Sequence, residues 1–184
     1  MIELKFFERK TDLVAKELIG KVLVRKIDDN FIEGIIVETE AYFGLKDPAS
    51  RAYNGIKNYN KIMWEEPGKI FIYNVHMYWM FNIVAHEKNE IGAVLIRAIE
   101  PIGSIVRELD NKELKKMFSG PGRLTKTLRI DKSLNGKFLG QESNIWIEDR
   151  GIDYEIGTSK RIGVRKDLKK NLRFFAKNNF FVSR

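Results

Sequence analysis

The chain has 184 residues, of which 43% are hydrophobic, and this is enough for one domain with an ordinary core. It contains no cysteine and only two histidines, which excludes disulfides, thiolate catalysis and thiolate zinc sites and argues against any metal site built by the protein. The formal net charge of +8 favours a polyanionic partner, nucleic acid above all, although a lysine-rich surface can also serve solubility alone.

Neither a membrane span nor a signal peptide is expected. The sequence has no run of eighteen apolar residues, and no positively charged segment precedes an apolar one at its start. No proline-rich or glycine-rich linker, low-complexity tract or repeat interrupts it. We therefore predict a cytoplasmic protein with a single domain over residues 1–184.

The N-terminal half is predicted to be one helix followed by strands. Thr11 and Asp12 can cap a helix whose apolar residues recur at helical spacing until Gly20 ends it. Segments rich in β-branched and aromatic residues then predict strands over residues 21–26, 31–42, 69–75 and 93–99. The polar cluster at residues 28–30 indicates a hairpin turn between the first two strands.

The C-terminal half mixes helical and strand patterns. A helix is expected after Pro101 as far as about Leu109, and two more are expected near residues 112–117 and over residues 124–128, with a loop at 119–122 before the last one. Strand-like runs return at residues 144–148, 161–164 and 172–176. Because the strands do not alternate regularly with helices, we predict a mixed α/β (α+β) fold with a largely antiparallel sheet and surrounding helices.

Two carboxylates and a phenol share one face of the predicted strand over residues 31–42. Alternate residues of a strand point the same way, so Glu38, Glu40 and Tyr42 project together, about 6.5 to 7 Å from one to the next. Such a pair of carboxylates suits general acid or base catalysis. A solvent-facing polar strand face would give the same alternation, so both interpretations stay open here.

Arg97 interrupts an apolar run that otherwise predicts a fully buried strand. A buried guanidinium needs an acidic partner, because leaving it unpaired would cost several kcal/mol. Glu40, Glu38 and Glu100 are the candidates, and the pair they form could be structural or catalytic.

Aromatic residues and a glycine-rich loop offer further binding elements. Tyr42 and Tyr73 are our choices for a platform that stacks on an unstacked base, a contact worth about 1 to 3 kcal/mol per base. The loop at residues 119–122, with Arg123 and Lys126 nearby, could cradle a phosphate through its backbone N–H groups or could be a plain turn.

Several motifs of the chain occur together, and in the same order, in a known family. In chain order they read VETEAYFGLKDPASRAYNG, PGKIFIY, YWMFN, AVLIRAIEP, SGPGRL, IWIE, RIGV and LRFF. On these motifs the chain resembles the alkyladenine DNA glycosylases, also called 3-methyladenine DNA glycosylases, over nearly its whole length. The resemblance implies a curved antiparallel sheet that carries a DNA-binding groove.

The resemblance also implies an activity, namely hydrolysis of the N-glycosidic bond of a damaged purine in double-stranded DNA, by a monomer without metal or organic cofactor. The damaged nucleotide must be flipped out of the duplex to reach an enclosed pocket. Glu40 matches the carboxylate that deprotonates the attacking water, and Arg97 matches the arginine that helps hold this water. Ile162 matches the residue whose backbone carbonyl also contacts it.

Other positions match residues that bind the flipped base. Tyr42 matches the aromatic residue that stacks on it, and Tyr73 matches a tyrosine of the same pocket. Asn82 matches the asparagine that excludes guanine by clashing with its 2-amino group. Arg51 departs from the family, which usually has a histidine there. Because an arginine cannot lose its proton, we expect this pocket to disfavour cationic alkylated bases and to prefer neutral bases such as hypoxanthine.

The pattern departs from the family at two more places. A tyrosine that wedges into the gap left by the extruded base is absent from the segment after Tyr73, which leaves His76 and Met77 as candidates for intercalation into DNA. Tyr59 stands where arginine is frequent. The alternative function is a non-catalytic protein on the same fold that binds damaged DNA or RNA, and no obligate protein partner is expected in either case.

Overall fold

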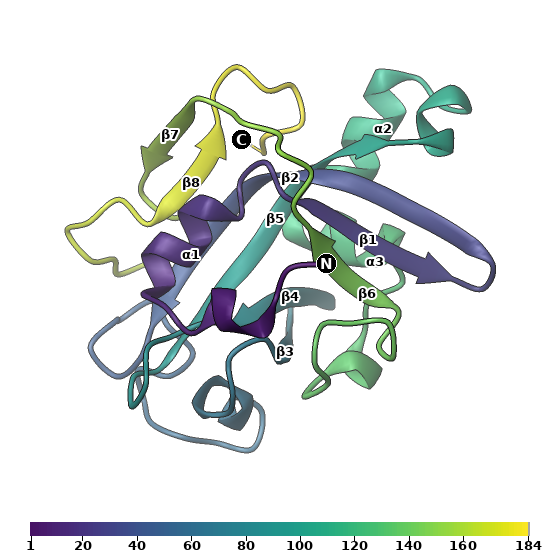
Figure 1. Ribbon diagram of the computed structural model, residues 1–184. Coiled ribbons are helices and arrows are strands. Elements are labelled where there is room, and N and C mark those ends of the chain that lie inside the picture. Colours follow the sequence, from purple (N-terminus) through teal and green to yellow (C-terminus); the bar gives the residue numbers. More distant parts are fainter. Residues whose placement is uncertain (184) are drawn as a thin grey trace.

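The computed structural model describes residues 1–183 and folds them around one sheet (Figure 1). The strands are β1 (Val22–Ile27), β2 (Asn30–Phe43), β3 (Ile70–Val75), β4 (Tyr78–Val84), β5 (Gly92–Ile102), β6 (Ile145–Glu148), β7 (Ile156–Ser159) and β8 (Arg173–Ala176). The α-helices are α1 (Thr11–Glu17), α2 (Asn111–Phe118) and α3 (Pro121–Thr127), and short 3-10 helices are η1 (Leu4–Phe7), η2 (Lys61–Trp64), η3 (Ser104–Arg107) and η4 (Lys132–Leu134).

The sheet is antiparallel at every pairing of these strands. Its order is β3-β4-β5-β2-β1-β6, and β8 pairs with β2 and with β7. The long strand β2 pairs with β5 along one edge and with β1 and then β8 along the other. The predicted mixed fold with a largely antiparallel sheet and surrounding helices is therefore confirmed.

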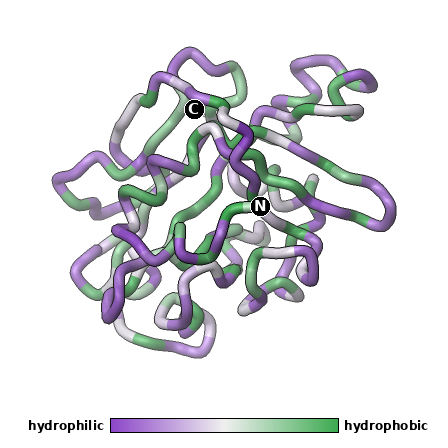
Figure 2. Tube along the Cα trace, viewed as in Figure 1, coloured by the Kyte–Doolittle hydropathy of each residue, from purple (hydrophilic) through white to green (hydrophobic). Residues whose placement is uncertain are grey.

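The core lies on both sides of this central pair of strands. Figure 2 shows hydrophobic colour along the central strands and hydrophilic colour over much of the outer loops. Helix α1 buries Val14 and Ala15, while α2 and α3 bury Phe118 and Leu124. The Thr39 hydroxyl donates to the carbonyl of Ala15 in α1 at 2.7 Å, so the next residue of β2 points to the opposite face.

None of the helices within residues 1–183 is both long and apolar enough to cross a bilayer.

Most predicted elements are present, but their boundaries differ at the helices. Helix α1 forms where expected, yet the predicted capping by Thr11 and Asp12 is wrong because both lie inside the helix. Lys10 precedes the first turn, and the Thr11 hydroxyl donates to the Ala85 carbonyl instead. Helix α2 is closed by a capping box between Asp110 and Glu113.

The predicted glycine loop at residues 119–122 is partly helix. Pro121 and Gly122 form the first turn of α3, and Gly122 packs so closely on Tyr78 that a Cβ atom would lie 2.7 Å from its ring. The Gly120 N–H already donates to the Arg97 carbonyl at 3.0 Å. These residues therefore serve packing, and Gly120 does not present its N–H to a phosphate.

Two predictions of secondary structure are wrong. The helix expected after Pro101 is absent, because Pro101 and Ile102 continue β5 and only the short η3 follows. A proline fits there because β4 pairs with β5 no further than Leu95, which leaves that edge open. The strand expected at residues 161–164 is a turn, where Gly163 adopts φ +74°. Strands β4 and β7 were not predicted.

A pair of irregularities in the β2–β5 ladder shapes the centre of the sheet. The register runs Ile36↔Ile99, Glu38↔Ala98 and Thr39↔Ile96, so Val37 and Arg97 each have no residue opposite them. An extra residue of this kind bends a strand and re-aims its side chains. The ladder is thus disturbed at the buried arginine itself.

A buried ionic clamp ties the loop after β2 to the turn at residues 161–164. The Arg161 guanidinium donates to both Asp47 carboxylate oxygens at 2.6 and 2.7 Å and to Asp167 at 2.5 Å. Asp47 also accepts from the backbone N–H groups of Phe43 and Ala49, at 3.0 and 3.1 Å. Burial lowers the pKa of Arg161, but hydrogen bonds to the two aspartates outweigh this effect and raise it above its usual value.

Replacing Asp47 with alanine is expected to lower the free energy of unfolding by about 3 to 5 kcal/mol, because it leaves the fully buried Arg161 side chain without its bidentate partner. Urea unfolding followed by circular dichroism measures this. Glu155→Ala, which breaks an exposed pair with Lys177, is the matched control and should change stability by less than about 0.5 kcal/mol. Equal losses of unfolding free energy in the two variants would contradict a stabilising role of the clamp.

Candidate active site

A cavity of about 700 Å³ opens beside the central strands and contains or adjoins most of the predicted residues. It lies between the loop after β2, the β3–β4 hairpin, the start of α3 and the turn after β7. Its lining residues are Tyr42, Pro48, Ala49, Arg51, Tyr73, Val75, His76, Met80, Leu95, Arg97, Pro121, Ile162, Gly163, Val164, Arg165 and Lys166. Three of these, Arg51, Arg165 and Lys166, are exposed and carry a positive charge, so the opening favours an anionic ligand.

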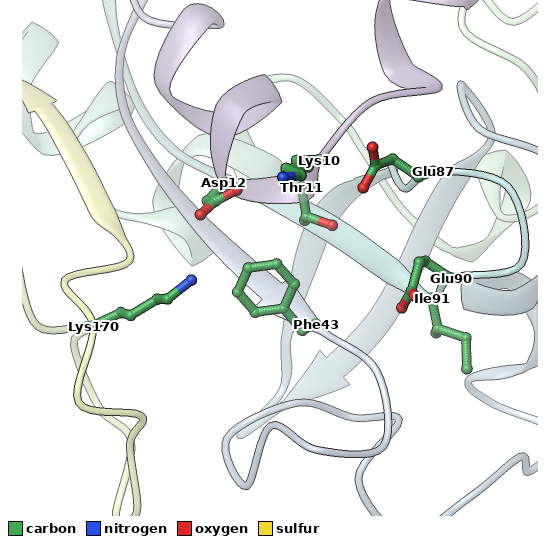
Figure 3. Close-up of a pocket in the computed structure, with 8 residues that line it drawn as sticks. All are labelled: Lys10, Thr11, Asp12, Phe43, Glu87, Glu90, Ile91 and Lys170. Atoms are coloured by element: carbon green, nitrogen blue, oxygen red, sulfur yellow. The ribbon is translucent and has the colours of Figure 1, made fainter.

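Figure 3 shows a second, smaller hollow of about 240 Å³. It lies around the start of α1 and the end of β2, and its labelled residues are Lys10, Thr11, Asp12, Phe43, Glu87, Glu90, Ile91 and Lys170. None of the predicted site residues lines it. The larger cavity is therefore the candidate site.

Glu40 lies directly behind the wall of the larger cavity and is fully buried. Its Oε1 atom accepts from the Ile162 backbone N–H at 2.7 Å. Its Oε2 atom accepts from the Tyr42 hydroxyl at 2.7 Å and from Arg97 Nη1 at 3.3 Å. All three donor residues line the cavity, so the Glu40 carboxylate is separated from the cavity only by the residues that hydrogen-bond to it.

Arg97 bridges Glu38 and Glu40 of β2. Its Nε atom donates to Glu38 Oε1 at 2.8 Å, while Nη1 reaches Glu40. Burial lowers the pKa of Arg97, but the charges of Glu40 and Glu38 outweigh this effect and raise it. Of the three partners proposed from the sequence, Glu38 and Glu40 are correct. Glu100 is not a partner, because it accepts hydrogen bonds from Tyr154 and Asn179.

Glu38 accepts four hydrogen bonds, three of them from residues that do not line the cavity. Besides Arg97, it accepts from Arg173 Nε at 2.7 Å and from the backbone N–H and hydroxyl of Ser183 at 2.7 and 2.8 Å. No part of Glu38 is exposed. This distinguishes the two carboxylates, because only Glu40 has all its donors in the cavity wall.

Two tyrosines form the aromatic walls of the cavity, and each carries an arginine on its ring. Arg161 lies 4.6 Å from the centre of the Tyr42 ring, and Arg51 lies 4.7 Å from that of Tyr73. Burial and the nearby Glu40 charge raise the pKa of Tyr42 well above its usual value, so its hydroxyl stays protonated and donates to Glu40. Burial raises the pKa of Tyr73 despite the opposing charge of Arg51.

Asn82 lies at the inner end of the space between these walls. It is 2% exposed and borders a recess of about 10 Å³ together with Tyr42, Arg51 and Tyr73. Its side-chain amide donates to the carbonyls of Phe71 and Met80, both at 3.1 Å. These two bonds fix the orientation of the amide.

Arg51 is exposed and is placed by a buried asparagine that the sequence did not single out for a role. Asn60 donates to the carbonyls of Arg51 and Gly55 at 2.7 and 3.0 Å and accepts from the Lys57 N–H at 2.6 Å. It thereby closes the loop that holds Arg51 over Tyr73.

His76 and Met77 are the two central residues of the turn between β3 and β4. Val75 pairs with Tyr78, and both central residues have positive φ, 47° and 71°. This is the type I′ geometry of a two-residue hairpin, which asparagine and glycine normally fill. His76 lines the cavity, whereas the Met77 side chain stands in solvent with the residue 92% exposed.

The structure thus brings Glu40, Arg97, Tyr42, Tyr73, Arg51, Ile162 and Asn82 to one cavity, with His76 at its wall and Met77 at the nearby hairpin tip. Sequence reasoning missed Asp47, Asn60, Arg161, Arg173 and Ser183. Arg161 and Arg173 stand in or beside short apolar runs, in RIGV and LRFF, which is a weaker form of the signal that identified Arg97. Within residues 1–183, no three histidine or acidic side chains are grouped to hold a metal ion.

Comparison with known proteins gives one consistent result. A sequence model described as methylpurine-DNA glycosylase matches residues 5–180. A protein of Clostridium perfringens is 40% identical over 97% of both chains, and one of Borreliella burgdorferi is 41% identical, also over 97% of both. One of Aeropyrum pernix is 37% identical over 97% of this chain and 91% of its own. All three carry the provisional name 3-methyladenine DNA glycosylase. The chain belongs to the methylpurine-DNA glycosylase family.

Proposed function

We propose that the chain removes damaged purines from double-stranded DNA by hydrolysing the bond between the base and C1′ of the deoxyribose, in base excision repair. Family membership and the names of the relatives support a DNA glycosylase acting on 3-methyladenine. The observation that carries the mechanism is the contact of the buried Glu40 with Arg97 at the wall of a cavity between two tyrosines. The positive lining of the opening suits the phosphates of DNA.

Glu40 is the proposed general base. A water at the cavity wall beside Arg97 and the backbone of Ile162 gives its proton to the Glu40 carboxylate as its oxygen bonds to C1′. The glycosidic bond breaks at the same centre, and the base leaves with the electron pair, as in inverting glycoside hydrolysis, where one carboxylate activates water opposite the leaving group. No lysine attacks C1′ in this scheme, so the enzyme leaves an intact abasic strand.

The aromatic walls are proposed to hold the flipped base. Tyr42 and Tyr73 supply stacking surfaces, and Asn82 at the inner end rejects a purine that carries a 2-amino group. Each ring already has a guanidinium on it. A cationic base against Tyr73 meets the like charge of Arg51, whereas a neutral base with an acceptor gains a donor in Arg51. The pocket should therefore prefer hypoxanthine to cationic alkylated purines.

Met77 is the proposed wedge into the gap left by the flipped nucleotide. An apolar side chain at the tip of a hairpin, with positive φ, costs free energy in the unbound protein. Backbone strain of this kind clusters at functional sites. Apolar side chains are known to insert between bases in proteins that kink DNA. His76 is the second candidate because it faces the cavity instead of projecting from the tip.

A non-catalytic protein that binds damaged DNA is the second candidate function. One observation favours it, since no part of Glu40 is exposed and its two oxygens already accept from Tyr42, Arg97 and Ile162. Hydrolysis requires water to reach this buried carboxylate. The following experiment separates the two functions.

The unmodified chain is expected to convert a duplex with one hypoxanthine or one 3-methyladenine into a product that breaks at the lesion only after alkali. Glu40→Gln should slow excision by a factor of about 10² to 10⁴, the contribution of general base catalysis, and leave binding intact. Single-turnover gel assays measure the rate. Intact binding without strand breakage for any lesion would establish the non-catalytic function, and breakage without alkali would contradict hydrolysis by water.

Arg51→His is expected to lower the ratio of the hypoxanthine excision rate to the 3-methyladenine rate by about tenfold, because histidine can lose its proton and relieve the repulsion of a cationic base. Single-turnover rates on the two duplexes give this ratio. Arg107→His, an exposed arginine in η3, is the matched control and should leave it unchanged. An unchanged ratio in Arg51→His would refute the role of Arg51 in lesion choice.

Met77→Gly is expected to raise the free energy of unfolding by about 0.5 to 1 kcal/mol, because glycine adopts positive φ without strain. The same variant should excise at least tenfold more slowly from a duplex but normally from a single strand, which has no gap to fill. Urea unfolding and single-turnover assays on both substrates measure these effects. A larger loss on the duplex with His76→Asn than with Met77→Gly would make His76 the wedge.

A further inference from the structure

The last residues described by the structure enter the ionic network behind the cavity. Figure 1 shows the C-terminal end beside β8 and β2. Ser183 is 7% exposed, and three of its groups are engaged there. Its N–H and its hydroxyl donate to the two Glu38 oxygens at 2.7 and 2.8 Å, and its carbonyl accepts from Arg173 Nη2 at 2.8 Å.

The Ser183 hydroxyl also meets the arginine of the site. Arg97 Nη2 donates to Ser183 Oγ at 3.4 Å, while the hydroxyl proton goes to Glu38. A hydroxyl can accept from a cation and donate to an anion at once, because it is both donor and acceptor. Alanine would lose both contacts, and threonine would keep them.

These contacts fix the direction of the guanidinium. The group is planar and rigid, so holding Nε on Glu38 and Nη2 on Ser183 determines where Nη1 points. Nη1 points to Glu40 at 3.3 Å. The contacts of Nη1 with Glu40 and of Nη2 with Ser183 are both long, at 3.3 and 3.4 Å. A small rotation of the guanidinium that shortens one of them therefore lengthens the other.

We propose that Ser183 is a positioning residue for excision: it sets the orientation of Arg97 and, through Arg97, the placement of Glu40 and the attacking water. This inference rests on the proposed function. Neither the charge pattern nor the apolar pattern of the sequence singles out Ser183, which stands 86 positions from Arg97 in the chain.

The segment before Ser183 is fastened independently of the hydroxyl. Asn179 donates to Glu100 at 2.6 Å and accepts from the Phe181 N–H at 2.9 Å. Phe181 is buried in the core, and Lys115 donates to the Phe180 carbonyl. The Ser183 backbone can therefore stay in place when the hydroxyl is removed, so Ser183→Ala tests the hydroxyl alone.

The test compares the full chain with Ser183→Ala, Ser183→Thr and, as a matched control, Ser133→Ala at an exposed serine of η4. Single-turnover excision and affinity for the same lesion duplex are measured together. Hydrogen exchange of the Arg97 Nε–H is followed by nitrogen-15 NMR, and the signal is assigned with Arg97→Lys. This measurement reports how firmly the guanidinium is held and does not depend on base excision.

Ser183→Ala is expected to slow excision about tenfold, to change DNA affinity less than twofold, and to speed exchange of the Arg97 Nε–H at least tenfold. Ser183→Thr should restore rate and exchange to within threefold, and Ser133→Ala should change neither. Unchanged exchange, unchanged excision, or a loss that threonine does not restore would overturn the proposal. A chain that excises nothing would refute the proposed function, and the exchange measurement would still decide whether Ser183 holds Arg97.

Discussion

The buried guanidinium of Arg97 between Glu38 and Glu40 is the interaction on which the candidate site depends. A charge removed from water costs several kcal/mol unless it is paired and its hydrogen bonds are satisfied, so the surrounding fold has to supply partners. The β2–β5 irregularity leaves Arg97 without a residue opposite it, and β2 supplies both carboxylates. With Arg173 added, the network holds two positive and two negative charges and is neutral.

A second buried arginine at the cavity, Arg161, is also paired with two carboxylates, but its cluster is not neutral. Arg161 pairs with Asp47 and Asp167, so its cluster carries one excess negative charge, and it also stacks on Tyr42. The turn that holds Arg161 also presents the Ile162 N–H to Glu40. One clamp therefore fixes an aromatic wall and a hydrogen bond to the proposed base. Neither depends on the substrate, which means that the site is largely preorganised before DNA binds.

The sequence predicted those parts of the fold and site in which one residue breaks a strong pattern. Arg97 interrupts a run of six apolar residues, and this identified both its burial and its acidic partners. Arg161 and Arg173 break much shorter runs flanked by charges, so the same signal was too weak. Strand β4 was missed because nearly all its residues are apolar and no alternation marks it, and the helix after Pro101 was wrong because β5 has an open edge that tolerates proline. The contacts of Ser183 and Asn60 are polar and non-local or within loops, and periodicity carries no information about them.

Tyr42 has two tasks in this arrangement that oppose each other. Its ring is the proposed stacking wall, while its hydroxyl occupies the Glu40 oxygen that Arg97 also contacts. Burial and the Glu40 charge raise the pKa of Tyr42, so at neutral pH the hydroxyl keeps its proton and remains a donor. The hydroxyl therefore competes with water for that oxygen, and the proposed stacking wall belongs to the same side chain. The proposed stacking surface and the proposed base are thus joined by one hydrogen bond, so any displacement of the Tyr42 ring also changes the surroundings of the Glu40 carboxylate.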